Sequence, residues 1–181
     1  MLAPPSAVDA PHHVLQLLSE LHQKSINQEP AYAKEGNITS DAVLGDLEDR
    51  KPGGNSAEEF DRLMLDKFVA LDEDKCHYCY QIINAIGATN VVEAGTSFGV
   101  STIYLALAVA KTKAATGKSG IVVATEKEEE KAAVARKYWA QCEVEKEIDL
   151  RVGDLLETLK DGLPQIDLLL LDSGFSSLAI I

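Results

Sequence analysis

One stretch of the sequence decides the fold, namely Val91-Val-Glu-Ala-Gly-Thr-Ser-Phe-Gly-Val-Ser-Thr-Ile-Tyr-Leu-Ala106. Its first residues, 91–94, form a short and mainly apolar run that predicts a buried strand. Apolar residues then recur at helical spacing over 100–107, after a turn that contains Gly95 and Gly99. A buried strand, a glycine-containing turn and a helix in this order are typical of the first unit of a parallel α/β sheet.

The same alternation of short apolar runs and longer amphipathic runs continues towards the C-terminus. Further strands are expected over 121–125, 148–152 and 166–171, with helices between them over 132–142 and 154–159. Continuous apolar strands are typical of parallel sheets that are covered on both faces. The predicted fold class is therefore α/β, with a Rossmann-like, doubly wound parallel sheet of about four strands.

The chain divides by its pattern into an N-terminal extension, residues 1–55, and a main domain, residues 56–181. In the extension, the apolar stripe over 14–21 predicts one short helix. The Gly, Pro, Asn and Asp content of residues 27–55 predicts a loop, with one short helix over 41–49.

The main domain begins with two helical runs before the first strand. Ser56 and Glu59 have the form of a capping box, which predicts a helix that includes the apolar positions over 60–68. A second helical run follows Asp72 and ends at Gly87.

Composition and charge exclude several classes of protein. The 181 residues carry a formal net charge of −12, which disfavours nucleic acid and anionic membrane as partners because both would repel the chain. No apolar stretch approaches the roughly 20 residues that span a bilayer. The three cysteines are too few for a disulfide scaffold and favour a reducing compartment, so a cytoplasmic protein is expected.

Two acidic residues at predicted strand ends indicate the kind of ligand. Ligands of such sheets bind beyond the carboxyl ends of the strands, where Glu93 and Glu126 are expected. A carboxylate at Glu93 would repel a pyrophosphate but could accept hydrogen bonds from an ammonium group. Ser101 and the amides at the helix N-terminus could hold a carboxylate, and Glu126 is placed to bind ribose hydroxyls. The pattern therefore predicts a nucleotide that bears an amino acid.

Several candidate residues also have a purely structural interpretation. Glu126 could be a solvated residue of the next helix, because Thr125 and Glu128 also have capping-box form. Asp154, with Glu157 after it, could serve only as a helix N-cap. For the Cys-His-Tyr-Cys run at 76–79 and for Trp139, packing in the core is favoured over metal binding and over cofactor stacking respectively.

Several segments together resemble a known enzyme family. They are the stretch from Val91 to Ala106, then Ala124-Thr-Glu126, Val152-Gly-Asp154 and Ile166-Asp-Leu-Leu-Leu-Leu-Asp172. They are similar to the S-adenosylmethionine-dependent O-methyltransferases of the catechol O-methyltransferase type, and the likeness runs from about Ser56 to Asp172. The resemblance implies a class I methyltransferase fold that transfers a methyl group to a hydroxyl of a small-molecule acceptor.

The resemblance also assigns the site. It places Glu93 and Ser101 at the methionine end of S-adenosyl-L-methionine, Gly95, Thr96, Ser97 and Gly99 in the loop around it, Glu126 at the ribose, and Gly153 and Asp154 beside the adenine. Asp172 matches a metal-binding or methyl-proximal acid, which implies a divalent cation such as Mg²⁺.

The chain ends at Ile181, whereas enzymes of this family continue with three more strands and further metal ligands. We therefore expect a C-terminally truncated domain that binds the cofactor weakly and has little or no activity. The fourth strand, with residues 168–171, would form an exposed edge and could self-associate. Two alternatives stay open: a non-catalytic cofactor-binding or interaction protein derived from this fold, and a nucleotide-binding oxidoreductase-like domain. The absence of a G-x-G-x-x-G motif disfavours the second.

Overall fold

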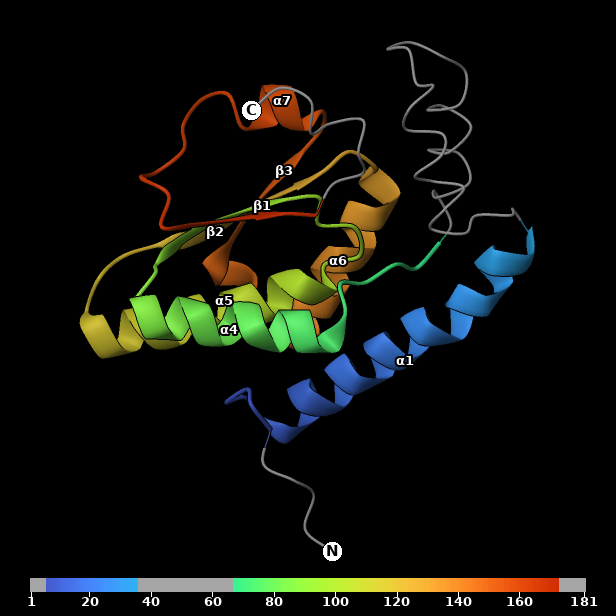
Figure 1. Cartoon of the computed structure of the whole chain (residues 1–181). Coiled ribbons are helices and arrows are strands. Elements are labelled where there is room, and N and C mark those ends of the chain that lie inside the picture. Colours follow the sequence, from blue (N-terminus) through green and yellow to red (C-terminus); the bar gives the residue numbers. More distant parts are fainter. Residues whose placement is uncertain (1–5, 36–66, 173–181) are drawn as a thin grey trace, which may run out of the picture.

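The computed structural model describes residues 6–35 and 67–172 (Figure 1). They contain a parallel sheet in the order β3-β2-β1-β4. The strands are β1 (Asn90–Ala94), β2 (Ile121–Glu126), β3 (Ile148–Val152) and β4 (Leu168–Leu171). The chain passes from β1 to β2 and β3 on one side and returns to β4 on the other side of β1. The sheet confirms the predicted parallel α/β class, and its switch point lies at the carboxyl end of β1.

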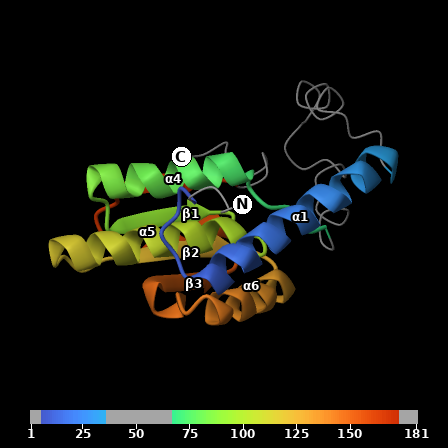
Figure 2. The same ribbon diagram turned by 90° about the horizontal axis from the view of Figure 1, so that it is seen from below.

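Helices connect the strands, and the longer ones of the described ranges pack on one face of the sheet, whereas Leu169 and Leu171 of β4 stay exposed on the other face. They are α4 (Glu73–Ile86), α5 (Val100–Thr116), α6 (Glu129–Gln141) and the short α7 (Leu155–Thr158), with one 3-10 turn, η1 (Glu145–Glu147). Figures 1 and 2 show α4 and α5 side by side on one face of the sheet, with α1 (His12–Glu35) crossing outside this layer. The helices from α4 onward therefore agree with the alternation expected from the sequence.

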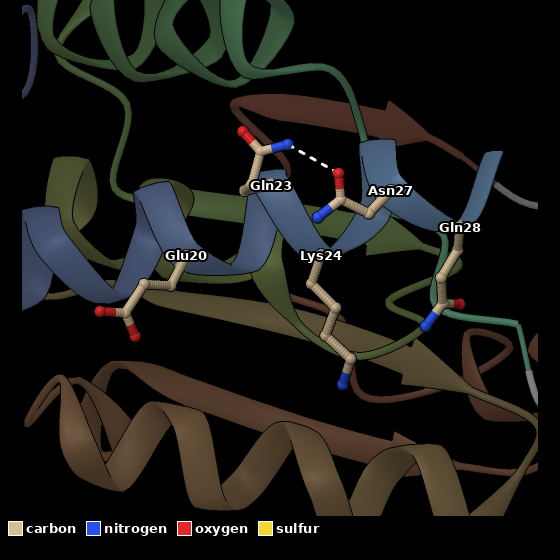
Figure 3. A pocket seen from close by; sticks show the side chains of 5 residues that line it. All are labelled: Glu20, Gln23, Lys24, Asn27 and Gln28. Atoms are coloured by element: carbon tan, nitrogen blue, oxygen red, sulfur yellow. Dashed lines mark hydrogen bonds between the residues drawn. The ribbon is translucent and has the colours of Figure 1, made fainter. Parts of the chain in front are cut away.

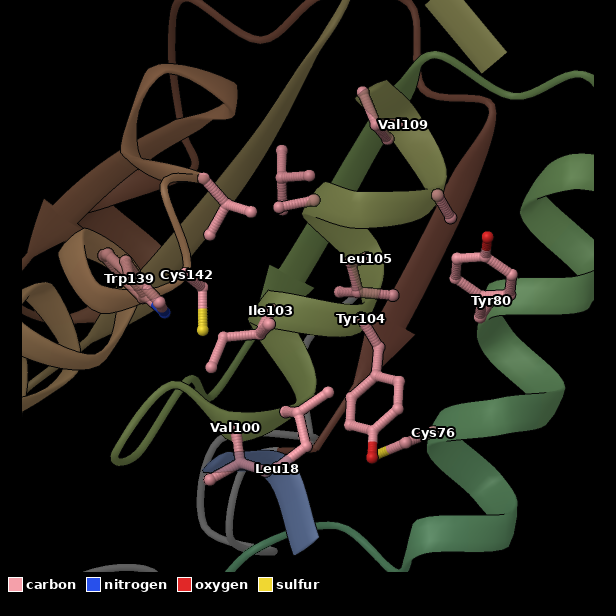
Figure 4. Close-up of a cluster of buried hydrophobic side chains, with 14 of the residues drawn as sticks. Leu18, Cys76, Tyr80, Val100, Ile103, Tyr104, Leu105, Val109, Trp139 and Cys142 are labelled. Atoms are coloured by element: carbon pink, nitrogen blue, oxygen red, sulfur yellow. The ribbon is translucent and has the colours of Figure 1, made fainter. Parts of the chain in front are cut away.

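The core lies between β1, β2 and the α4–α5 layer (Figure 4). Val91 of β1 pairs with Val122 of β2 and Leu168 of β4, so that apolar side chains line up across the sheet. Helix α5 is buried on most sides because it packs against the sheet, α4 and α6. This packing explains why α5 is apolar around most of its circumference rather than along one stripe.

The N-terminal helix differs from the expectation. It runs from His12 to Glu35 through Pro30, whereas a short helix followed by a loop from residue 27 was expected. Part of the reason is tertiary, because Ser25 and Gln28 accept hydrogen bonds from the backbone amides of residues 70 and 68 respectively, which fix the helix as far as residue 28. The helix expected over 41–49 lies outside the described residues.

The first helical run expected before β1 can be compared with the structure only in its last residues. The helical run expected over 60–68 falls mostly outside the described ranges, and its last residues, Lys67 and Phe68, are not helical. The next expected helix is confirmed as α4. It ends at Gly87, which adopts the left-handed conformation with a φ of 68°.

Strand β4 forms one edge of the described sheet, as predicted, and is two residues shorter than expected. Leu169 and Leu171 on it are 41% and 42% exposed. Leu168 and Leu170 instead pack against the core. Self-association through this edge stays a prediction.

None of the helices in the described ranges has the length and apolar character of a membrane-spanning segment.

Two isoleucines of α4 provide a matched test of this packing. Ile83 is fully buried, whereas Ile86, one turn further on, is 57% exposed. Ile83→Ala is expected to lower the free energy of unfolding by about 2–5 kcal/mol, because it leaves a cavity under the helix. Ile86→Ala should change it by less than about 0.5 kcal/mol. Urea unfolding measures both, and equal losses would contradict the placement of α4.

Candidate functional site

The loop between β1 and α5, residues 95–99, has an unusual backbone. Gly95 and Gly99 have φ values of 96° and 78°, which a residue with a side chain rarely adopts. Ser97 also has a positive φ, 50°, although it is not glycine. Such a conformation persists only where surrounding contacts hold it, and it is common at ligand-binding sites. We call residues 95–99 the glycine loop.

The glycine loop is attached to β2 through its backbone. The Thr96 amide donates to the Thr125 carbonyl at 2.8 Å, and the Gly95 amide donates to the Thr125 hydroxyl at 3.2 Å. The Thr125 hydroxyl in turn lies 3.3 Å from the Glu93 carbonyl. Thr125 therefore belongs to β2 and fixes the loop there, so the interpretation of Thr125 as a helix cap is wrong.

Glu93 is a fully buried carboxylate beneath the glycine loop. Its oxygens accept hydrogen bonds from the hydroxyls of Ser101 at 2.5 Å, Thr102 at 2.6 Å and Thr96 at 2.8 Å. Burial raises the pKa of Glu93, and the three hydroxyl donors lower it. Sequence reasoning missed Thr102. The signal that could have found it is the need of a buried carboxylate for several donors nearby.

Glu126 closes β2 and is only 8% exposed. Its carboxylate accepts hydrogen bonds from the backbone amides of Ser97 at 2.7 Å and Glu128 at 2.9 Å. Burial raises the pKa of Glu126, and the backbone donors lower it. Because α6 begins only at Glu129, the interpretation of Glu126 as a solvated helix residue is wrong.

The two carboxylates therefore meet at the same loop. Glu93 binds the side chain of Thr96, and Glu126 binds the backbone of the next residue, Ser97. Ser101, the predicted carboxylate-binding residue, lies in the first turn of α5 with its hydroxyl bound to Glu93. The structure thus brings together the residues expected at the methionine and ribose ends. Their contacts with a cofactor stay predictions.

Trp139 of α6 contacts the end of the glycine loop. Its side chain is buried, as expected for a core residue, and its Nε1 donates a hydrogen bond to the Gly99 carbonyl at 3.0 Å. A Cβ atom on Gly99 would lie 2.5 Å from this nitrogen and 2.8 Å from the Cβ of Ala135. Gly99 is therefore required both by its positive φ and by the close approach of α6. This contact had no signal in the sequence pattern.

The residues predicted to border the adenine follow β3. The Gly153 amide donates to the Glu126 carbonyl at 2.9 Å, which places this turn next to the end of β2. Asp154 caps α7, because its carboxylate accepts a hydrogen bond from the Leu156 amide at 2.9 Å. The capping interpretation of Asp154 is therefore observed, and its role beside an adenine stays a prediction.

Asp172 follows β4 and lies beside the end of β1, since its amide donates to the Ala94 carbonyl at 2.9 Å. The described part of the chain contains no group of three or more His, Cys, Asp or Glu side chains that could hold a metal ion. Asp172 as a metal ligand stays a prediction.

Cys76 is buried and its thiol lies 3.5 Å from the Leu71 carbonyl, in agreement with a packing role.

Solved structures resemble this fold. TomG, an O-methyltransferase of Streptomyces achromogenes solved with SAM, is 21% identical and has a TM-score of 0.54, over 92% of this chain and 55% of that one. An O-methyltransferase of Bacillus cereus solved with SAH is 20% identical, with a TM-score of 0.53 over 84% and 63% of the two chains. Cofactor-bound Rv0187 from MTB is 27% identical, with a TM-score of 0.51 over 71% and 58%. These likenesses define the class of the fold as that of an α/β methyltransferase.

The sequence profile of the O-methyltransferase family matches residues 53–178. Because this match covers more than half of the chain, the protein belongs to the O-methyltransferase family. The chain spans less than two thirds of the length of the solved structures named above. No curated protein sequence matches it.

The contact between Gly99 and Trp139 can be tested with a matched pair of glycines. Gly99→Ala introduces both a strained φ and a clash with Trp139, whereas Gly117→Ala at the end of α5 has a similar φ of 70° and no atom within 4 Å of the new Cβ. Both variants are expected to lose about 1–2 kcal/mol to backbone strain. Gly99→Ala should lose about 1–3 kcal/mol more from overpacking. Urea unfolding compares them, and equal losses would show that α6 does not press on the loop.

The buried carboxylate of Glu93 predicts a dependence of stability on pH. Burial raises the pKa of Glu93 in the folded protein above its ordinary value of 4.5, so folding disfavours the ionised form. This cost is absent well below pH 4.5 and grows as the pH rises through the pKa of the folded state. Glu93→Gln does not titrate, so its stability relative to wild type is expected to increase between about pH 4 and pH 8.

Chemical unfolding at a series of pH values measures this difference. Glu130→Gln, at an exposed position in the first turn of α6, is the control and should run parallel to wild type. A constant difference between Glu93→Gln and wild type across the series would contradict the raised pKa.

Proposed function

We propose that the protein binds S-adenosyl-L-methionine at the glycine loop. One observation carries this proposal: buried carboxylates at the ends of two neighbouring strands, Glu93 and Glu126, bind adjacent residues of the same loop. TomG and the Bacillus cereus enzyme, which share this fold, were solved with SAM and SAH. Membership of the O-methyltransferase family supports the same cofactor.

The residues around the loop suggest how the cofactor would be held. The first amides of α5 have no partners within the helix and suit a carboxylate, to which the Ser101 hydroxyl could donate only by turning away from Glu93. Glu93 accepts the hydrogen bond of that hydroxyl in the structure, and its ionised form favours an ammonium group nearby. Glu126 suits the ribose hydroxyls, and the turn at Gly153 and Asp154 suits the adenine, because both follow the neighbouring strands.

We further propose that the protein methylates a hydroxyl oxygen of a small molecule. S-adenosyl-L-methionine, when bound, supplies an electrophilic methyl group. The contribution of the chain is to hold the reactants in line, which is the main requirement of such a displacement. A divalent cation at Asp172 would coordinate oxygen atoms of the acceptor, but no step proposed for this chain depends on it.

The free thiols of Cys76, Cys79 and Cys142 favour a reducing compartment, and we propose the cytoplasm.

Isothermal titration calorimetry of the full chain tests this proposal. S-adenosylhomocysteine is expected to bind, because the acidic groups beside the loop suit the ammonium group of an amino acid. NAD is not expected to bind, because the loop lacks the third glycine of a dinucleotide-binding motif. Glu126→Gln should weaken binding about tenfold, since it removes a charged acceptor for ribose hydroxyls.

Glu130→Gln changes the same charge at an exposed position of α6 and should bind like wild type. Binding of NAD in preference to S-adenosylhomocysteine would favour an oxidoreductase-like domain instead. Equal affinity of wild type and Glu126→Gln would remove the proposed role of Glu126.

A further inference from the structure

A short non-helical segment, residues 67–70, lies against the outer side of the glycine loop. Phe68 stacks on Phe98 with ring centroids 4.7 Å apart and an angle of 25° between the rings. The Ser97 hydroxyl donates a hydrogen bond to the Val69 carbonyl at 3.2 Å. Two consecutive residues of the loop thus contact two consecutive residues of this segment, which we call the strap.

The strap is held by side chains of α1. The Phe68 amide donates to Gln28 Oε1 at 2.9 Å, and the Ala70 amide donates to Ser25 Oγ at 3.1 Å. Lys24 lies over the Phe68 ring, with its Nζ 4.2 Å from the centroid. Irregular backbone needs hydrogen-bond partners from elsewhere, and α1 supplies them here.

Helix α1 is itself fixed to the core and to α5. Leu18 and Leu21 are buried in the core, and His22 Nε2 lies 2.9 Å from the Tyr104 hydroxyl of α5 in a buried contact. Figure 3 shows Lys24 and Gln28 on the next turns of the same helix, where they line a surface pocket of about 400 Å³. The strap is therefore anchored, through α1, to the helix that begins at the glycine loop.

The contact at Ser97 has a physical consequence for the loop. The positive φ of Ser97 is unfavourable for a residue with a side chain, so it needs contacts that compensate for the strain. Among the contacts described here, Glu126 binds the Ser97 backbone from one side and the strap binds its hydroxyl from the other. Loss of the strap would release one of these two restraints.

We propose that Ser25 and Gln28 are positioning residues for the cofactor: they hold the strap against the glycine loop and thereby set the affinity for the amino-acid part of S-adenosylmethionine. The proposal rests on the cofactor site proposed above. The strap contacts Ser97 and Phe98, which lead directly into Ser101 at the methionine end, whereas Gly153 and Asp154 lie on the far side of β2. Glu126, at the proposed ribose site, also accepts a hydrogen bond from the Ser97 amide, but the Glu128 amide holds its carboxylate independently of the strap. The adenosine part of the site should therefore depend on the strap less.

The test compares two ligands in one double variant. Ser25→Ala with Gln28→Ala removes both acceptors for the strap, and calorimetry measures its affinity for S-adenosylhomocysteine and for adenosine. The affinity for S-adenosylhomocysteine is expected to fall about tenfold, corresponding to part of two hydrogen bonds, and that for adenosine less than about twofold. Ser25→Thr with Gln28→Glu keeps both acceptors and should restore binding.

Gln23→Ala is the matched control, because Gln23 is exposed on the same helix and its side chain bonds to Asn27 within α1. It should leave both affinities unchanged. An equal fall for both ligands in the double variant would indicate a general structural effect and overturn the proposal, as would no fall at all.

Hydrogen exchange of the ligand-free protein separates this proposal from the proposed function. The peptide covering residues 95–99 is expected to exchange several-fold faster in the double variant than in wild type or Gln23→Ala. Unchanged exchange would overturn the role of the strap. If wild type binds no S-adenosylhomocysteine, the proposed function fails, and the exchange rates still decide whether the strap holds the loop.

Discussion

The buried carboxylate of Glu93 is the constraint on which the rest of the site depends. A carboxylate removed from water needs donors for both oxygens, and here three hydroxyls provide them. Thr96 comes from the glycine loop, and Ser101 and Thr102 come from the first turn of α5. One side chain at the end of β1 thus fixes both the loop and the start of the helix that follows it.

The sequence predicted the parallel sheet because its strands are continuous apolar runs and its helices have clear periodicity. The two acids at strand ends were predictable for a similar reason, since topology alone places the ends of neighbouring parallel strands together. Glu126 illustrates the limit of local patterns. Its flanking residues have capping-box form, yet Thr125 stays in the strand because its backbone and hydroxyl bind the glycine loop.

Contacts between distant elements could not be predicted from the sequence. Trp139 reaches the Gly99 carbonyl and His22 reaches the Tyr104 hydroxyl, and neither pair has a spacing that indicates contact. The length of α1 was underestimated for the same reason. Pro30 and the polar residues after Asn27 favour a loop locally, whereas the hydrogen bonds of Ser25 and Gln28 to the strap hold the helix as far as residue 28.

The glycine loop is held from four directions by other parts of the chain. Glu93 binds it from below, β2 through Thr125 and Glu126, α6 through Trp139, and α1 through the strap. This arrangement explains how Ser97 keeps a positive φ, because its own contacts with Glu126 and Val69 compensate for the strain while the other contacts fix the residues on either side. A loop that is already ordered loses little conformational entropy when a ligand binds, so more of the contact energy contributes to affinity. The strain at Ser97 is therefore the cost of a preorganised site.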